Sequence, residues 1–139
     1  MQSNDLYREE ILEHYQNPQN FGKLESFDIS SKQTNPFCGD EIEIYIKFAC
    51  DSWGANINPP LGWKILEIGF LGKGCAICIA ATSILTEYAK NKTKKQLTKL
   101  TEKDMLTLLG IEVSETRKKC AMLGLAVLKD CLNANKVRI

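Results

Sequence analysis

The hydrophobic residues change their spacing halfway along the chain, and this change restricts the fold more than any other feature of the sequence. Over residues 42–48 they alternate with other residues, which predicts a strand with one buried face. Residues 63–71 predict a second strand. After Cys75, apolar residues recur at steps of three and four, as along a helix. Strands followed by helices indicate an α+β fold, in which helices cover one face of a small antiparallel sheet.

The rest of the chain can be placed around this pattern. Residues 7–15 predict an amphipathic first helix, which ends before Pro18 because the residue preceding a proline avoids the helical region. Residues 49–62 are rich in Gly, Asn and Pro and predict a long loop between two strands. No repeat, low-complexity tract or linker interrupts the sequence, so we expect one domain over residues 1–139.

Capping residues predict where three later helices begin. Thr93 opens a short helix, Thr101 opens another that Gly110 ends, and Ser114 opens the last one. Together with the apolar spacing, these caps place all the later helices in the second half of the chain.

Six cysteines beside a single histidine are the unusual part of the composition. We expect a cytoplasmic protein, because the N-terminal residues lack a secretory signal and no apolar run is long enough to span a membrane. Structural disulfides are rare in that compartment. The formal net charge of +1 favours neither a nucleic-acid partner nor a membrane partner. The cysteines therefore serve as core residues, metal ligands or nucleophiles.

Three of the cysteines lie near the beginning of a predicted element. Cys38 precedes the strand of residues 42–48, Cys75 lies between a strand and a helix, and Cys120 follows a basic run in the last helix. Helix N-termini and neighbouring cations lower the pKa of a thiol. Asp40, two residues after Cys38, adds a carboxylate. Three thiolates and one carboxylate suit zinc or an iron–sulfur cluster, although the spacing is not that of a zinc finger.

Four short motifs follow one another along the chain: residues 6–22, Cys38-Gly39-Asp40, the Gly74-Cys75 turn and Lys119-Cys120-Ala121. In this order they resemble the iron–sulfur cluster assembly scaffolds of the IscU/SufU/NifU type. The resemblance implies an IscU-like fold with a sheet of about three strands. It also implies that Cys38, Asp40, Cys75 and Cys120 converge at one metal site.

The resemblance further implies a scaffold or carrier rather than an enzyme. A cysteine desulfurase would deliver sulfur as a persulfide, with Cys38 and Cys120 as the acceptor candidates that we expect to be better exposed. A labile [2Fe–2S] cluster, held by the three cysteines and Asp40, would then pass to a recipient apo iron–sulfur protein. Without a cluster, the same four groups would suit zinc. The oxygen ligand of Asp40 would hold iron less durably than a fourth thiolate.

Departures from the IscU branch keep an alternative function open. Lys119 stands where that branch has His, and an ammonium group has no lone pair to offer a metal. Lysine at this position resembles the SufU branch, which implies a zinc-dependent sulfurtransferase, but the insertion usual in that branch is missing. Residues 113–116 replace the Leu-Pro-Pro-Val-Lys segment recognised by the dedicated chaperone of the IscU branch, which argues against that partner.

The remaining cysteines and the histidine have simpler interpretations. Cys75 and Cys78 form a CxxC between a strand and a helix, so a dithiol redox protein is a remote alternative. Cys78 is otherwise a buried small residue or an auxiliary thiol, able to resolve a persulfide or to substitute as a ligand. We interpret Cys50 and Cys131 as structural, and His14 as structural or interfacial.

Overall fold

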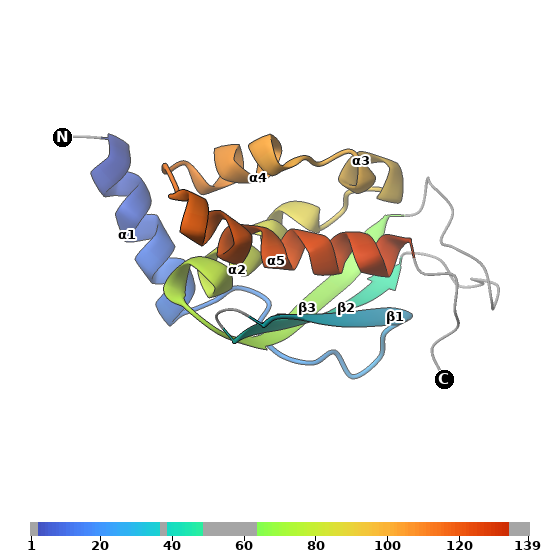
Figure 1. Ribbon diagram of the computed structural model, residues 1–139. Coiled ribbons are helices and arrows are strands. Elements are labelled where there is room, and N and C mark those ends of the chain that lie inside the picture. The colour runs from blue at the N-terminus through green and yellow to red at the C-terminus, as the bar shows by residue number, and fades with distance from the viewer. Residues whose placement is uncertain (1–2, 37–38, 49–63, 134–139) are drawn as a thin grey trace.

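The computed structural model describes residues 3–36, 39–48 and 64–133. Three strands and five helices lie within these residues (Figure 1). Along the chain they are α1 (Ser3–Gln16), β1 (Ile29–Asn35), β2 (Asp40–Phe48), β3 (Ile65–Lys73), α2 (Ala76–Ala89), α3 (Lys94–Thr98), α4 (Glu102–Leu109) and α5 (Glu115–Leu132). In the described part of the chain, no helix is both long enough and apolar enough to cross a lipid bilayer.

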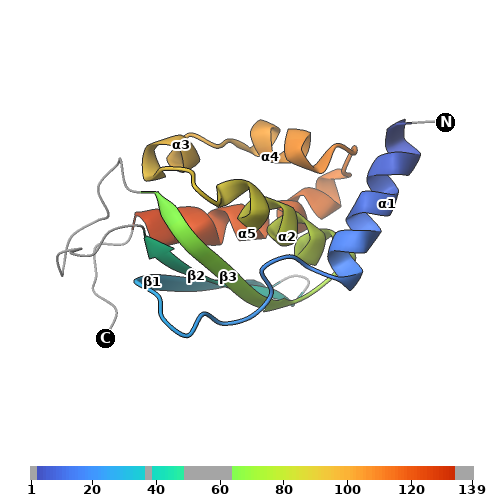
Figure 2. The same cartoon turned by 180° about the vertical axis from the view of Figure 1, so that it is seen from behind.

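The three strands form one antiparallel sheet in the order β1-β2-β3. Helices α2 and α5 cover one face of this sheet, and α3 and α4 lie beyond them (Figures 1 and 2). This arrangement confirms the predicted α+β fold. Within the sheet, Asp40 at the start of β2 pairs with Asn35, whereas Phe48 at its other end pairs with Ile65. The loop predicted over residues 49–62 lies outside the described residues, and its flanking residue Phe48 is at the end of β2 away from Asp40.

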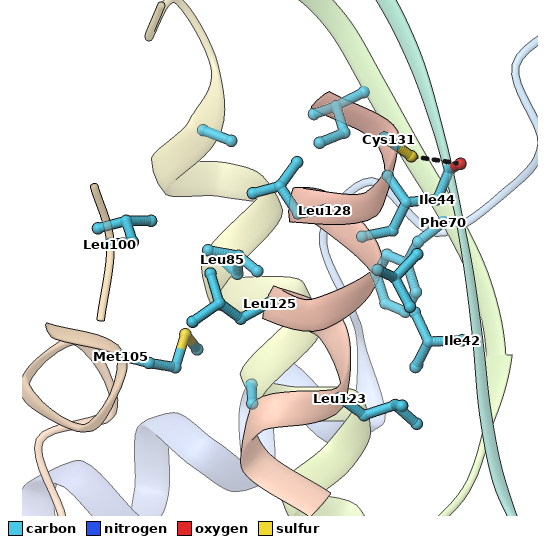
Figure 3. Packing of buried hydrophobic residues seen from close by; sticks show 14 of the residues in the cluster. Ile42, Ile44, Phe70, Leu85, Leu100, Met105, Leu123, Leu125, Leu128 and Cys131 are labelled. Atoms are coloured by element: carbon cyan, nitrogen blue, oxygen red, sulfur yellow. Dashed lines mark hydrogen bonds between the residues drawn. The ribbon is translucent and has the colours of Figure 1, made fainter. Parts of the chain in front are cut away.

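The core lies between the sheet and the helices, as the alternation of residues 42–48 predicted. Ile42, Ile44 and Ile46 of β2 have no exposed surface, and Ile42 and Ile44 face residues of α5 (Figure 3). The Cys131 thiol donates to the Ile44 carbonyl oxygen at 3.7 Å, and burial raises the pKa of this thiol. These contacts confirm that Cys131 is structural.

Tyr45 corrects the prediction that only one face of β2 is buried. Its side chain lies on the other face, yet only 4% of it is exposed. The segment between α1 and β1 runs along this face (Figures 1 and 2), and its Phe27 ring packs edge-on against Tyr45 with centroids 5.0 Å apart. Alternation within one strand does not reveal a cover that comes from another segment.

The predicted caps of the later helices are confirmed, whereas α1 begins at Ser3, before the predicted residue 7, and the first strand was not predicted individually. The side chains of Thr93, Thr101 and Ser114 each cap a helix, and Gly110 ends α4 with a left-handed φ of 73°. The hydrophobic pattern does not predict strand β1, because Ile29 is its only buried residue and the others are polar. A polar edge strand has no hydrophobic alternation from which to predict it.

Hydrogen bonds attach the end of α1 to the middle of α2. The Ser83 hydroxyl accepts from the backbone N–H of Gln19 at 2.8 Å and lies 2.7 Å from Nδ1 of His14. The side-chain amide of Asn20 donates to the Thr86 hydroxyl at 3.0 Å. The structural interpretation of His14 is therefore confirmed: its ring is part of the contact between two helices.

Candidate metal and sulfur site

Three elements bring three of the predicted ligands together. Asp40 is the first residue of β2, Cys75 precedes α2, and Cys120 lies in the second turn of α5. One carboxylate oxygen and the two sulfur atoms all lie within 4.8 Å of one another. The fourth predicted ligand, Cys38, lies outside the described residues. It belongs to the short connection between β1 and β2, whose described ends, Asn35 and Asp40, are paired at this site.

Asp40 is held in place by the turn that follows β3. Its side chain is almost fully buried, at 2% exposure, and Oδ1 accepts from the backbone N–H of Cys75 at 3.2 Å. The thiol of Cys75 lies 3.8 Å from Oδ2. Gly74 makes this approach feasible, because a Cβ atom there would lie 2.5 Å from Oδ1 of Asp40. The sequence motif contains Gly74, but this steric reason for it appears only in the structure.

Cys75 occupies the N-cap position of α2. Its backbone is extended, and its side chain makes no capping hydrogen bond to the helix. The thiol is instead directed towards Asp40, at the N-terminal end of α2. Cys75 is half-buried, whereas Cys120 is only 6% exposed. The expectation that Cys120 is the better exposed acceptor is therefore wrong relative to Cys75, because Cys120 belongs to the hydrophobic core.

A cavity of about 610 Å³ opens beside the two thiols. Cys75 and Cys120 both line it, together with the cationic residues Arg117 and Lys119 at the start of α5. Glu115 also lines the cavity, so its wall carries two cationic side chains and one anionic side chain. Both cationic residues belong to the basic run, Arg117-Lys118-Lys119, that precedes Cys120 in the sequence.

Cys78 lies next to this site without being part of the group of three donors. It is fully buried in the first turn of α2. Burial raises the pKa of its thiol, and the nearby Asp40, Cys75 and Cys120 raise that pKa further. The interpretation of Cys78 as a buried small residue is confirmed, and these interactions also place it beside the predicted ligands. Cys50 lies outside the described residues.

The donor set fits the metals that the resemblance implies. Thiolates and a carboxylate are ligands for zinc and for iron, and three donors within one small volume leave one position of a tetrahedral ion for a fourth group. The same thiols can carry sulfur, because a thiolate is the nucleophile in persulfide and disulfide exchange. The arrangement therefore suits both metal binding and sulfur transfer.

Comparison with known proteins agrees with this chemistry. Residues 6–139 match the family model for the NifU-like N terminal domain. A relative from Archaeoglobus fulgidus, the iron-sulfur cluster assembly scaffold protein IscU 1, is 36% identical over 105 residues, which are 76% of this chain and 61% of that protein. The zinc-dependent sulfurtransferase SufU of Bacillus subtilis is 29% identical over 141 residues, covering 89% of this chain and 87% of that protein.

A solved structure shares the fold as well. It is named as an iron-sulfur cluster assembly scaffold protein for the SUF system from Fervidobacterium islandicum. It has a TM-score of 0.71 and 25% identity to this chain, and the match covers 95% of this chain and all of that one. The chain spans about three fifths of the length of the Archaeoglobus relative.

Proposed function

The chain belongs to the family of NifU-like N-terminal domains, and we propose that it is a scaffold on which iron–sulfur clusters are assembled before transfer to other proteins. The observation that supports this proposal most is the convergence of Asp40, Cys75 and Cys120, whose donor atoms come within 4.8 Å of one another from three separate elements. A buried carboxylate beside two thiols is the donor set that a releasable cluster needs.

Sulfur would reach the site through the cavity. A cysteine desulfurase would present a persulfide, and a thiolate of the scaffold would take over its outer sulfur. Cys75 and Cys120 both line the cavity, and Arg117 and Lys119 at its wall favour an anionic sulfur. Cys38 stays an acceptor candidate on the strength of the family motif.

The cluster is the cargo of this scaffold, and Asp40 would make it releasable. We propose that Cys38, Cys75 and Cys120 hold a [2Fe–2S] cluster together with the Asp40 carboxylate. An oxygen ligand binds iron less durably than a thiolate does, so the cluster would leave for a recipient apo-protein at this position first. Asp40 is oriented for this role by the backbone N–H of Cys75.

The second candidate function is that of a zinc-dependent sulfurtransferase. Lys119 favours it, because this residue lines the cavity next to Cys120 and cannot ligate a metal. In that case zinc would be held by the same three cysteines and Asp40, and the protein would only pass sulfur on.

Metal and sulfide analysis of protein purified without oxygen separates the two functions. The scaffold function predicts that reconstitution with iron, sulfide and a thiol reductant gives the visible absorption of a [2Fe–2S] cluster, with equal amounts of iron and acid-labile sulfide. Protein that retains one zinc and forms no cluster under these conditions would establish the sulfurtransferase function instead. A Cys131→Ser variant serves as the control, since this cysteine belongs to the core.

A further inference from the structure

Cys75 and Cys78 occupy the N-cap and N3 positions of α2. An N-cap side chain ordinarily reaches over the first helical turn towards position N3, where it accepts a hydrogen bond from the backbone. The Cys75 side chain makes no such bond. Its sulfur lies 3.8 Å from Oδ2 of Asp40 instead, and the residue at N3 is a second cysteine.

The two cysteines differ in exposure in the way that a two-thiol exchange requires. Cys75 lines the 610 Å³ cavity and is half-buried, whereas Cys78 is fully buried. A reagent entering the cavity thus meets the sulfur of Cys75 first. The N-cap and N3 side chains of a helix both belong to its first turn, which places Cys75 and Cys78 on the same turn of α2.

We propose that Cys78 resolves a persulfide formed on Cys75, so that the scaffold releases the incoming sulfur as sulfide. This inference rests on the proposed function, since it concerns the sulfur that a scaffold receives. The Cys78 sulfur attacks the Cys75 sulfur of the persulfide, and a Cys75–Cys78 disulfide forms. The outer S–S bond breaks, and its electron pair leaves with the outer sulfur. Cys78 gives up its proton in this exchange, the outer sulfur takes up a proton, and it departs as hydrogen sulfide.

The electrons in this step come from the chain itself. Cys75 and Cys78 are together oxidised to a disulfide, and the outer sulfur is reduced to sulfide, the form that a cluster contains. A dithiol reductant then returns the pair to two thiols. Cys78 suits this role better than Cys120, because Cys120 is one of the three converging donors and Cys78 is not. The disulfide would take Cys75 out of the donor group until it is reduced, whereas Cys120 would stay a thiol.

The step can be followed in a single peptide. Trypsin releases residues 74–90, which contain Cys75 and Cys78 and no other cysteine. The metal-free, reduced protein is treated with one equivalent of inorganic polysulfide without oxygen, alkylated at intervals and analysed by mass spectrometry. We expect a short-lived persulfide on Cys75, then a peptide lighter than the reduced form by two hydrogen atoms, with free sulfide released in step.

Cys78→Ala removes the resolving thiol and keeps a small apolar residue in the helix. In this variant the Cys75 persulfide should last at least about tenfold longer, because the intramolecular attack is lost. Cys131→Ala is the matched control, since Cys131 is also fully buried but bonds to Ile44, and it should behave as the wild type. Circular dichroism checks that both variants fold.

Three results would overturn the inference. They are an equally long persulfide lifetime in wild type and Cys78→Ala, a persulfide carried by Cys78, and a disulfide that joins residues 74–90 to the peptide containing Cys120. Zinc binding by both variants is measured in parallel. Failure of the wild type to form a cluster on reconstitution would contradict the proposed function, whereas the persulfide assay is done without metal and tests Cys78 alone.

Discussion

The carboxylate of Asp40 accepts a hydrogen bond from the backbone N–H of Cys75 at 3.2 Å, although 35 residues separate them in the sequence. One candidate ligand therefore fixes the position of another. The bond also connects the start of β2 to the N-terminus of α2, so the geometry of the candidate site depends on how closely the turn after β3 approaches the sheet.

Gly74→Ala tests this dependence. The added Cβ would lie 2.5 Å from Oδ1 of Asp40 and 2.8 Å from its Cγ, so the carboxylate must move. We expect a loss of about 1–3 kcal/mol in the free energy of unfolding. Zinc affinity should fall by about 10–100-fold, as when a ligand loses its orienting contact. Competition with a chromophoric chelator measures the affinity.

Gly110→Ala is the control for Gly74→Ala. Gly110 ends α4 with a positive φ of 73°, so alanine there costs about 1 kcal/mol of stability through backbone strain. Its zinc affinity should equal that of the wild type. Equal affinities in all three proteins would show that Asp40 does not need the close approach of Gly74.

The cysteines should fall into two groups when each is replaced by serine. Cys75→Ser and Cys120→Ser remove donors of the converging group, and Cys38→Ser removes the donor implied by the family motif. Each should lower zinc affinity by at least about tenfold. Cys50→Ser and Cys131→Ser should leave it unchanged. The measurement is the metal content after dialysis against a chelator. If Cys120→Ser retained as much metal as the wild type, the proposed site would be excluded.

Asp40→Ala should make a reconstituted cluster longer-lived and slower to transfer, because the hard oxygen ligand is the weak one. Asp40→Asn is the companion variant, since it keeps an oxygen that can accept from the Cys75 N–H. The decay of the visible absorption in the presence of a chelator gives the lifetime, and the appearance of cluster on an apo-ferredoxin gives the transfer rate. Unchanged values in Asp40→Ala would remove the argument for a labile ligand.

Local signals in the sequence were sufficient for most of the elements. The caps at Thr93 and Thr101 and the alternation of residues 42–48 each depend on neighbours within one element, and the structure agrees with them. The prediction that Asp40, Cys75 and Cys120 converge came from the resemblance to a family, because the spacing of residues along the chain does not show which distant residues meet in the fold.

What could not be predicted depends on contacts between distant segments. The cover of Tyr45 comes from Phe27, and the need for glycine at position 74 comes from Asp40. The greater burial of Cys120 than of Cys75 likewise depends on how α5 packs against its neighbours. In each case the residues adjacent in the sequence do not indicate the contact with the distant segment.

Tyr45 should make the stability of the fold sensitive to alkaline pH. Burial, assisted by the nearby Glu43, raises the pKa of Tyr45 to about 12, above its ordinary value of about 10. The unfolded chain therefore loses this proton first, so stability is unaffected below pH 10 and falls as the pH rises from 10 to 12. Urea unfolding over this range should show Tyr45→Phe losing less stability than the wild type, by on the order of 1 kcal/mol. Parallel losses in both proteins would contradict this role.

Helices α2 and α5 approach each other closely where Gly124 meets Thr82, and Cys75 and Cys120 lie near the N-terminal ends of these two helices. A Cβ at Gly124 would lie 2.5 Å from Oγ1 of Thr82, which is fully buried, so Gly124→Ala must separate the helices. We expect a loss of about 1–3 kcal/mol in urea unfolding, together with weaker zinc binding. Thr82→Ala removes the obstructing oxygen, so the double variant should regain at least half of both losses. If the two changes were simply additive, the contact between Gly124 and Thr82 would not account for these losses.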